Sequence, residues 1–221
     1  MNKLKLYSYF RSSSAYRVRI ALNLKNIEYE YIPIHLLKDG GDQTKPQFKS
    51  INPICQVPCL DDEGHIISQS MAIITYLDKI KPEPILLPPD PLFLAQVIEV
   101  CEIINSGIQP LQNLAVLKKL KEDFSVGTEE SNLWSQFWIE KGFIAIEQKI
   151  KNTVGKYCFG NQITAADAFL IPQVYNAKRF QIDLNKYPTI NKVNQHCLEL
   201  EAFQKSSPGK QPDTPSDYIS P

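Results

Sequence analysis

The chain has 221 residues, of which 43% are hydrophobic, so it can bury a substantial core as one large domain or two small ones. Its 24 lysines and arginines balance its 24 aspartates and glutamates, and this neutrality argues against nucleic acid or an anionic membrane as a partner. No apolar run approaches the ~20 residues of a membrane helix, and the amino terminus lacks the apolar core of a signal peptide, so we expect a cytoplasmic protein.

The cysteines and histidines form no recognisable framework. The cysteines are odd in number and irregularly spaced, which fits neither paired disulfides nor paired metal ligands. We therefore expect buried free thiols. The histidines lie far apart without clustered acidic neighbours, so no metal site is predicted. The residues concerned are Cys55, Cys59, Cys101, Cys158 and Cys197, and His35, His65 and His196.

The first predicted elements form a β-α-β unit. Residues 3–9 are apolar and aromatic and predict a strand, residues 14–26 have helical spacing, and residues 28–34 predict a second strand. A crossover helix between two nearby strands implies parallel pairing with a right-handed connection.

The turn between the first strand and the helix holds three consecutive serines, Ser12, Ser13 and Ser14. One serine suffices to cap a backbone amide at a helix start. Three of them, beside the positive end of a helix dipole, would also stabilise an anion or a thiolate. Taken alone, the run favours plain capping.

A proline stands at the entrance to the next predicted strand, residues 52–60, which turns at 61–64 into residues 65–67. X-Pro bonds in folded proteins are mostly trans, so the sequence favours an ordinary trans turn at Val57-Pro58. If the bond is cis, the Val57 amide and carbonyl can pair with an extended peptide ligand.

A second polar helix start precedes the predicted helix 71–81. Gln69 and Ser70 either cap this helix or bind a carboxylate together with its exposed amides. Residues 81–91 then hold five prolines, which forbid regular structure and predict a linker at a domain boundary.

After the linker the pattern predicts helices and no strands. A helix from Pro91 is disturbed at 106–110 and resumes to about 117. Residues 118–131 are charged and irregular, and we expect either a solvated loop or a frayed helix end there. Residues 133–151 predict a further helix, and a capping box from Thr164 to Asp167 predicts the start of a buried one. A last helix is expected at 189–202, followed by a coil tail at 206–221 that is ordered only if it packs back on the protein.

These features together resemble the zeta class of the glutathione S-transferase family, whose members carry a Y-F-R-S-S-C-S-x-R-V-R-I-A-L segment matched here by residues 9–22. The resemblance implies an α/β N-terminal thioredoxin-like domain plus an all-α C-terminal helical domain. The implied ranges are 1–83 for the glutathione-binding domain, 84–91 for the linker and 92–221 for the helical, substrate-binding domain. Further matching pieces are Gln56 to Pro58, Gln69-Ser70, Gln109 to Leu114, Asn176 to Phe180 and Gln211 to Pro215.

The resemblance also implies a site, a cofactor and a homodimer. Glutathione is the implied cofactor and a small dicarboxylate the implied substrate. The catalytic residues would be Ser12, Ser13 and Ser14. Glutathione would also be bound by Ala15, Tyr16, Arg17, Gln43, Val57, Gln69, Ser70, Gln109 and Asn113. Arg11 and Arg179 are candidate clamps for the substrate carboxylates, since a guanidinium binds a carboxylate with two parallel hydrogen bonds; the alternative for each is an ion pair.

Maleylacetoacetate isomerases belong to this class, so the resemblance predicts glutathione-dependent cis-trans isomerisation in tyrosine and phenylalanine catabolism. Three alternatives stay open: a general glutathione transferase, a maleylpyruvate isomerase, and an inactive transferase-like binding protein. Ser14 stands where the class carries Cys, and Ala15 where it carries Ser. The isomerisation should not need a protein thiol, because glutathione supplies the nucleophile.

Overall fold

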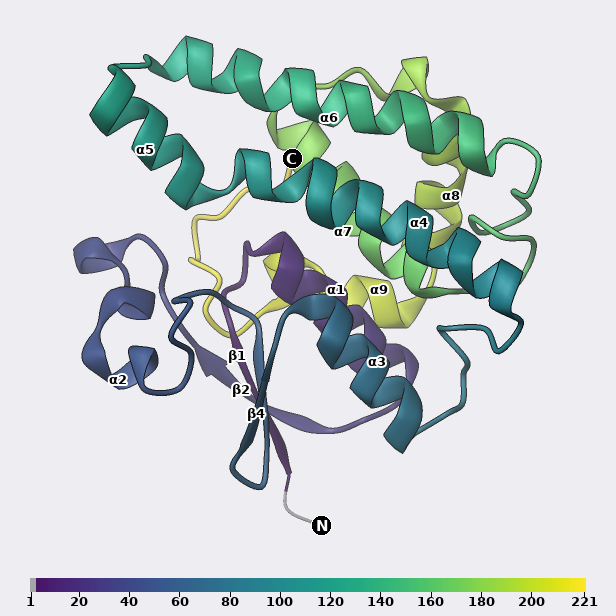
Figure 1. Cartoon of the computed structure of the whole chain (residues 1–221), viewed down its shortest axis with the longest axis horizontal. Coiled ribbons are helices and arrows are strands. Elements are labelled where there is room, and N and C mark those ends of the chain that lie inside the picture. The colour runs from purple at the N-terminus through teal and green to yellow at the C-terminus, as the bar shows by residue number, and fades with distance from the viewer. Residues whose placement is uncertain (1–2) are drawn as a thin grey trace. The chain divides into compact units, whose positions relative to one another are not determined.

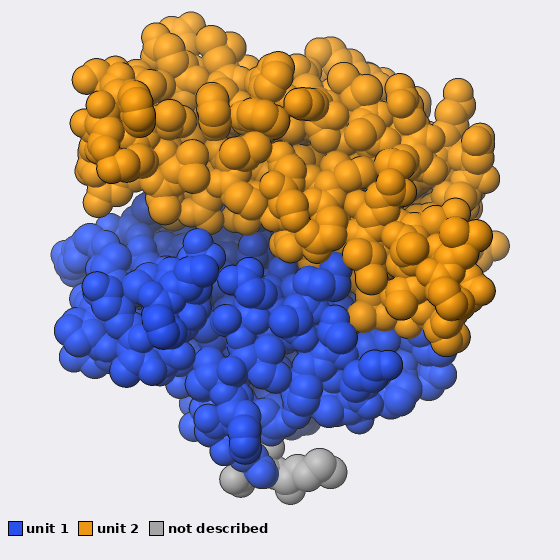
Figure 2. Space-filling model, in the orientation of Figure 1, with its two compact units in different colours: residues 1–86, 198–220 blue, residues 87–197, 221 orange. Residues whose placement is uncertain are grey.

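The computed structural model describes residues 3–221 (Figure 1). The chain divides into two compact units, coloured separately in Figure 2. The first unit holds the residues up to Leu86 together with Leu198–Ser220, and the second holds Leu87–Cys197 with Pro221. The division after Leu86 falls inside the predicted linker of residues 84–91. The segment from Leu198 groups with the first unit, whereas the sequence places it in the helical domain of residues 92–221.

The first unit is built on a four-stranded sheet. Its strands are β1 (Leu4–Ser8), β2 (Tyr29–Pro33), β3 (Cys59–Asp62) and β4 (His65–Ser68), in the spatial order β2-β1-β3-β4. Strand β1 pairs in parallel with β2 and antiparallel with β3, and β3 and β4 form an antiparallel hairpin. The predicted β-α-β unit and hairpin are therefore confirmed.

Four helices accompany this sheet. They are α1 (Ser13–Leu24), α2 (Pro46–Lys49), α3 (Ser70–Ile80) and α9 (Glu201–Ser206), with 3-10 turns at Lys38–Gly40, Asp42–Thr44 and Pro208–Lys210. Helix α1 contacts both α3 and α9 (Figure 1), and nine of its twelve residues are buried. Because α1 is covered on several sides, its amino-terminal turn has a fixed position in the unit.

The carboxyl-terminal segment packs on the first unit. The predicted helix 189–202 is in fact two helices, since α8 (Pro188–Leu198) ends before an extended backbone at Leu200 that precedes α9. The tail from Ser206 onward packs back on this unit, which is the condition under which an ordered tail was expected. The Asn23 amide donates to Ser206 Oγ over 2.7 Å, and Tyr218 packs against an apolar cluster that includes Phe10.

The second unit is helical. Its elements are α4 (Pro91–Gly107), a 3-10 turn (Gln109–Gln112), α5 (Leu114–Phe124), α6 (Thr128–Ile150), α7 (Ala165–Arg179), a 3-10 turn (Leu184–Lys186) and most of α8. Helix α7 is buried over twelve of its fifteen residues and begins at the predicted capping box. The central, buried helix expected from its apolar composition is confirmed.

Of the two alternatives predicted for residues 118–131, the solvated loop is wrong, and the helix end is regular rather than frayed. Helix α5 continues to Phe124, and α6 begins only four residues later at Thr128. The charges that suggested a loop form ion pairs along α5, from Lys118 to Glu122 and from Lys119 to Asp123, and such i,i+4 pairs stabilise a helix.

One stretch, Pro91–Phe124, is long and apolar enough to pass a length-and-composition test for a membrane span, contrary to the expectation that no run comes close. The stretch is not one continuous helix. Helix α4 has 17 residues, ends at Gly107 and is followed by a 3-10 turn, whereas a spanning helix needs about 20 residues. Its buried face, which includes Val97 and Ile104, is that of a core helix.

Candidate functional site

The serine turn joins the end of β1 to the start of α1. Ser12 is the N-cap of α1, and its Oγ accepts a hydrogen bond from the Ala15 amide over 3.2 Å. The Ser12 amide donates to the Tyr9 carbonyl over 3.0 Å, which closes the turn. Within residues 3–221, the Ser13 and Ser14 hydroxyls make no hydrogen bond. One serine thus caps the helix, and two further hydroxyls lie beside the positive end of its dipole.

The next residues of α1 point into the unit. Tyr16 is almost fully buried and its hydroxyl donates to the Phe203 carbonyl over 3.4 Å. Arg17 is fully buried, and its Nη1 donates to Ser70 Oγ over 3.1 Å. The structure therefore connects the serine turn directly to the second polar helix start, through a side chain that the sequence assigned to glutathione binding.

Gln69 and Ser70 form that second helix start, at α3. Gln69 is exposed and has φ 72° and ψ 121°, a backbone conformation that residues other than glycine rarely adopt. Its side chain makes no capping hydrogen bond to α3, so plain capping does not explain it. Strained non-glycine positions of this kind cluster at ligand-binding sites, which favours the binding interpretation of Gln69.

The Val57-Pro58 bond is cis, so the expectation of a trans bond is wrong. The loop before it is held by the buried Asn52, whose Nδ2 donates to the Gln56 carbonyl over 2.8 Å. In the part of the chain that the structure describes, the Val57 amide and carbonyl take part in no hydrogen bond. They are thus available to pair with an extended peptide.

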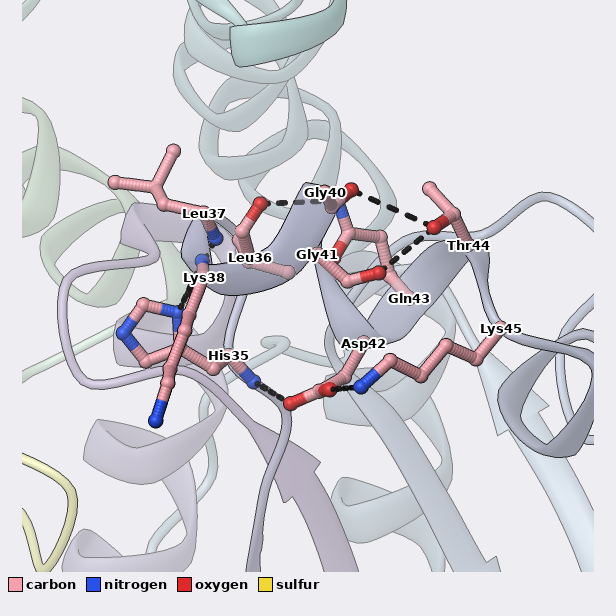
Figure 3. A network of polar contacts seen from close by, with 10 residues as sticks. All are labelled: His35, Leu36, Leu37, Lys38, Gly40, Gly41, Asp42, Gln43, Thr44 and Lys45. Atoms are coloured by element: carbon pink, nitrogen blue, oxygen red, sulfur yellow. Dashed lines mark hydrogen bonds and ion pairs between the residues drawn. The ribbon is translucent and has the colours of Figure 1, made fainter.

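Gln43 lies in a loop with a dense polar network (Figure 3). Asp42 accepts from the His35 amide over 3.0 Å and pairs with Lys45 over 2.6 Å, and these donors hold the pKa of its carboxyl below the usual value. The Gln43 amide donates to the Leu36 carbonyl over 3.2 Å, while its Oε1 is buried without a partner. At Gly41 (φ 91°) a Cβ would lie 2.6 Å from the Leu36 carbonyl oxygen, a backbone atom that cannot easily move aside, so only glycine fits there.

The other residues predicted to bind glutathione or substrate come from both units. Gln109 opens the 3-10 turn after α4, and Asn113 is the N-cap of α5, with its Oδ1 accepting from the Ala115 amide over 3.0 Å. Arg179 ends α7 and donates to Asn176 Oδ1 over 3.3 Å. These three belong to the second unit. Arg11 belongs to the first, with its guanidinium 6.0 Å from the ring centroid of Phe10.

The cysteines are mostly buried thiols, unlike the partly exposed Ser12 and Ser14 of the serine turn. All five cysteines are free; four are buried and Cys55 is partly exposed. Burial raises the pKa of Cys59 to about 11, so it stays protonated at neutral pH. Among residues 3–221, no group of three or more histidine, cysteine or acidic side chains is arranged to hold a metal ion.

Two residues near the turn received no role from the sequence. Arg19 lies in the matching segment and Asp213 in the matching tail, yet a pattern match gives no partner for either side chain. In the structure both bind the backbone of Phe10, two residues before Ser12.

Comparison with known proteins shows the family of this chain. Residues 2–79 match the family model described as the glutathione S-transferase N-terminal domain. The maleylacetoacetate isomerase of Rattus norvegicus is 52% identical over 212 residues, which cover 96% of this chain and 95% of that protein.

Solved structures show the same similarity over nearly the whole chain. A holo maleyl pyruvate isomerase, described as a bacterial glutathione S-transferase in the zeta class, has a TM-score of 0.92 and 40% identity and covers 96% of this chain and 100% of its own. The maleylacetoacetate isomerase of Anaeromyxobacter dehalogenans 2CP-1, solved with bound GSH in the active site, has a TM-score of 0.86 and 43% identity over 96% of this chain and 98% of its own. This chain is therefore a member of the zeta class of the glutathione S-transferase family.

Proposed function

We propose that this enzyme converts maleylacetoacetate to fumarylacetoacetate, with glutathione as a cofactor that is regenerated in each cycle. The observation that carries the proposal is the 52% identity to a maleylacetoacetate isomerase over nearly the whole chain, together with the serine turn at the start of α1. The reaction belongs to tyrosine and phenylalanine catabolism.

The chemistry follows from the substrate. Maleylacetoacetate has a cis double bond conjugated to carbonyls, and rotation about it is blocked while the double bond persists. The glutathione thiolate adds to one carbon and the electron pair moves to the carbonyl oxygen as an enolate. Rotation about the new single bond and expulsion of the thiolate then give the trans isomer, with no net change in electrons. The enzyme must therefore favour the thiolate, whose free thiol has a pKa near ~8.5.

Ser12 is the residue we assign to the sulfur. Its oxygen already accepts the Ala15 amide hydrogen, and its own hydroxyl proton remains to be donated to a thiolate in front of α1. A hydrogen bond to a charged acceptor is stronger than a neutral one, and the helix dipole acts in the same direction. Ser13 and Ser14 support this role, which needs no cysteine in the turn.

The other assignments follow the shape of glutathione. The Val57 backbone pairs with the cysteinyl backbone, and Gln69 and Ser70 bind the γ-glutamyl carboxylate. The available Val57 amide and carbonyl, the strained Gln69 and the buried Arg17–Ser70 hydrogen bond support these assignments. Backbone amides of Ala15 to Arg17, with Gln43, Gln109 and Asn113, complete the proposed glutathione contacts. Arg11 and Arg179 bind the two carboxylates of the substrate, for which planar guanidinium groups are well suited.

A second candidate is maleylpyruvate isomerisation, which the TM-score of 0.92 to a maleyl pyruvate isomerase favours. The deciding experiment measures turnover by the purified enzyme of each cis substrate, with and without glutathione, and of a general electrophile. We expect the highest kcat/KM with maleylacetoacetate and no reaction without glutathione. Faster turnover of maleylpyruvate, or conjugation without isomerisation, would replace the primary assignment, and failure of calorimetry to detect glutathione binding would indicate an inactive binding protein.

We further propose a cytoplasmic homodimer, in keeping with the family. Light scattering at micromolar concentration measures the oligomeric state directly, and we expect twice the chain mass of 25.2 kDa. A mass of one chain at all concentrations would contradict it.

A further inference from the structure

The peptide unit of Phe10 is held from both sides by charged side chains. Its amide donates to Asp213 Oδ2 over 2.9 Å, and its carbonyl accepts from Arg19 Nη2 over 2.9 Å. Phe10 lies two residues before Ser12, and the preceding carbonyl, that of Tyr9, accepts both from the Ser12 amide and from Arg19 Nη1. The backbone that enters the serine turn is thus fixed by one buried cation and one carboxylate.

Arg19 is fully buried and uses its guanidinium on the backbone of this region. Besides the two carbonyls, Nη1 donates to Ser8 Oγ over 3.1 Å, and Nε donates to the Ser206 carbonyl of α9 over 3.0 Å. Burial lowers the pKa of Arg19, which shows that the surroundings desolvate the charge. A buried guanidinium is costly unless its donors are satisfied, and here each nitrogen has an acceptor.

Asp213 comes from the other end of the chain, 203 residues away from Phe10. Its second oxygen accepts from the Tyr31 hydroxyl of β2 over 2.6 Å, and burial raises the pKa of Tyr31, so the phenol remains a donor. The segment around Asp213 is anchored by Gln211, whose amide donates to the Lys205 and Ser207 carbonyls over 2.8 Å and 2.7 Å. Asp213 therefore has a fixed position on the sheet.

We propose that Asp213, acting with Arg19 through the peptide unit of Phe10, is a positioning residue that sets the orientation of Ser12 toward the glutathione sulfur. This inference rests on the proposed function of the serine turn. It assigns a role in catalysis to the carboxyl-terminal segment, which the domain ranges drawn from the sequence place in the other domain.

The test compares Asp213→Ala with Asp217→Ala, a control that removes an exposed carboxylate from the same segment. The first readout is the pKa of enzyme-bound glutathione, followed by the ultraviolet absorbance of the thiolate. Loss of the Asp213 charge alone would favour the thiolate and lower this pKa, since a nearby negative charge disfavours a second one. Loss of positioning would raise it instead, because Ser12 no longer donates well to the sulfur.

We expect the bound thiol pKa to rise by roughly one unit in Asp213→Ala, so that the thiolate fraction falls about tenfold below that pKa. We also expect kcat for isomerisation to fall by a similar factor with KM for glutathione within about twofold. Asp217→Ala should match the wild type in both. Asp213→Asn keeps an oxygen that can accept the Phe10 amide hydrogen, and it should recover part of the loss.

An unchanged or lowered thiol pKa with unchanged kcat in Asp213→Ala would overturn the proposal. If Asp213→Ala does not fold, Tyr31→Phe removes the phenol that orients Asp213, and a thiol pKa identical to wild type in that variant would likewise overturn it. The thiol titration needs bound glutathione but no isomerase activity. Wild-type enzyme that binds glutathione and fails to isomerise would therefore refute the proposed reaction without touching the positioning role.

Discussion

Helices α1 and α7 both begin at a hydroxyl side chain, yet their first turns differ in how completely their polar groups are satisfied. At α7, Asp167 Oδ2 accepts from the Thr164 amide over 2.8 Å and from the Thr164 hydroxyl over 3.2 Å, and Oδ1 accepts from the Cys158 amide over 2.8 Å. All of these groups are buried. At α1, one cap at 3.2 Å serves the turn, and Ser12 and Ser14 are partly exposed.

The difference separates a structural helix start from one suited to bind a ligand. A saturated, buried network has no donor left for a ligand, and its removal leaves several backbone groups unsatisfied in the interior. A partly exposed turn with hydroxyls to spare keeps donors for a ligand and contributes less to folding. Three predictions test this contrast.

The largest effect is expected at Asp167. Asp167→Ala leaves two amides and a hydroxyl without their acceptor in the interior, at about 1–3 kcal/mol each, so the free energy of unfolding should fall by about 3 kcal/mol or more. Urea denaturation at neutral pH measures this. The matched control is Asp90→Ala, which removes the exposed N-cap of α4 and should cost about 1 kcal/mol. If the free energy of unfolding fell equally in the two variants, the buried network at Asp167 would be worth no more than an ordinary helix cap.

The second effect is expected at Ser12, in turnover rather than stability. Ser12→Ala removes one hydrogen bond to a charged sulfur, about 1.5–3 kcal/mol, so kcat should fall roughly 10- to 100-fold with little change in glutathione affinity. The cost in stability is that of an ordinary cap, about 1 kcal/mol. The control is Ser50→Ala, at an exposed helix end of the same unit, which should leave turnover and stability unchanged. Wild-type turnover in Ser12→Ala would exclude Ser12 from catalysis.

The smallest effect concerns thiol reactivity. A thiol introduced by Ser14→Cys would lie at the start of α1, where the helix dipole favours the thiolate, so it should react with iodoacetamide at neutral pH several-fold faster than a free cysteine. Cys158, beside Asp167, should stay unlabelled because burial raises its pKa well above the usual value. Mass spectrometry counts the labelled sites, and glutathione should protect position 14. An unreactive thiol there would mean that the α1 turn does not activate sulfur.

Local patterns predicted most of the elements. The strand, helix and second strand at the amino terminus were placed within two residues of their observed ends, because apolar periodicity and caps act over a few residues. The capping box at Thr164 was read from two residues alone. The charged segment at 118–131 misled the same reasoning, since lysine and glutamate predict solvent exposure equally well in a loop and on a helix.

The family, the order of the elements, and a serine turn with Ser14 in place of the cysteine of its class could all be predicted from the residues alone. Folding in three dimensions was needed to reveal that the Val57-Pro58 bond is cis, that Arg17 joins the turn to Ser70, and that the tail packs on the first unit. These features differ in how far apart along the chain the interacting residues lie. A cap or a helix face depends on near neighbours, whereas the Phe10–Asp213 hydrogen bond joins residues that only folding brings together.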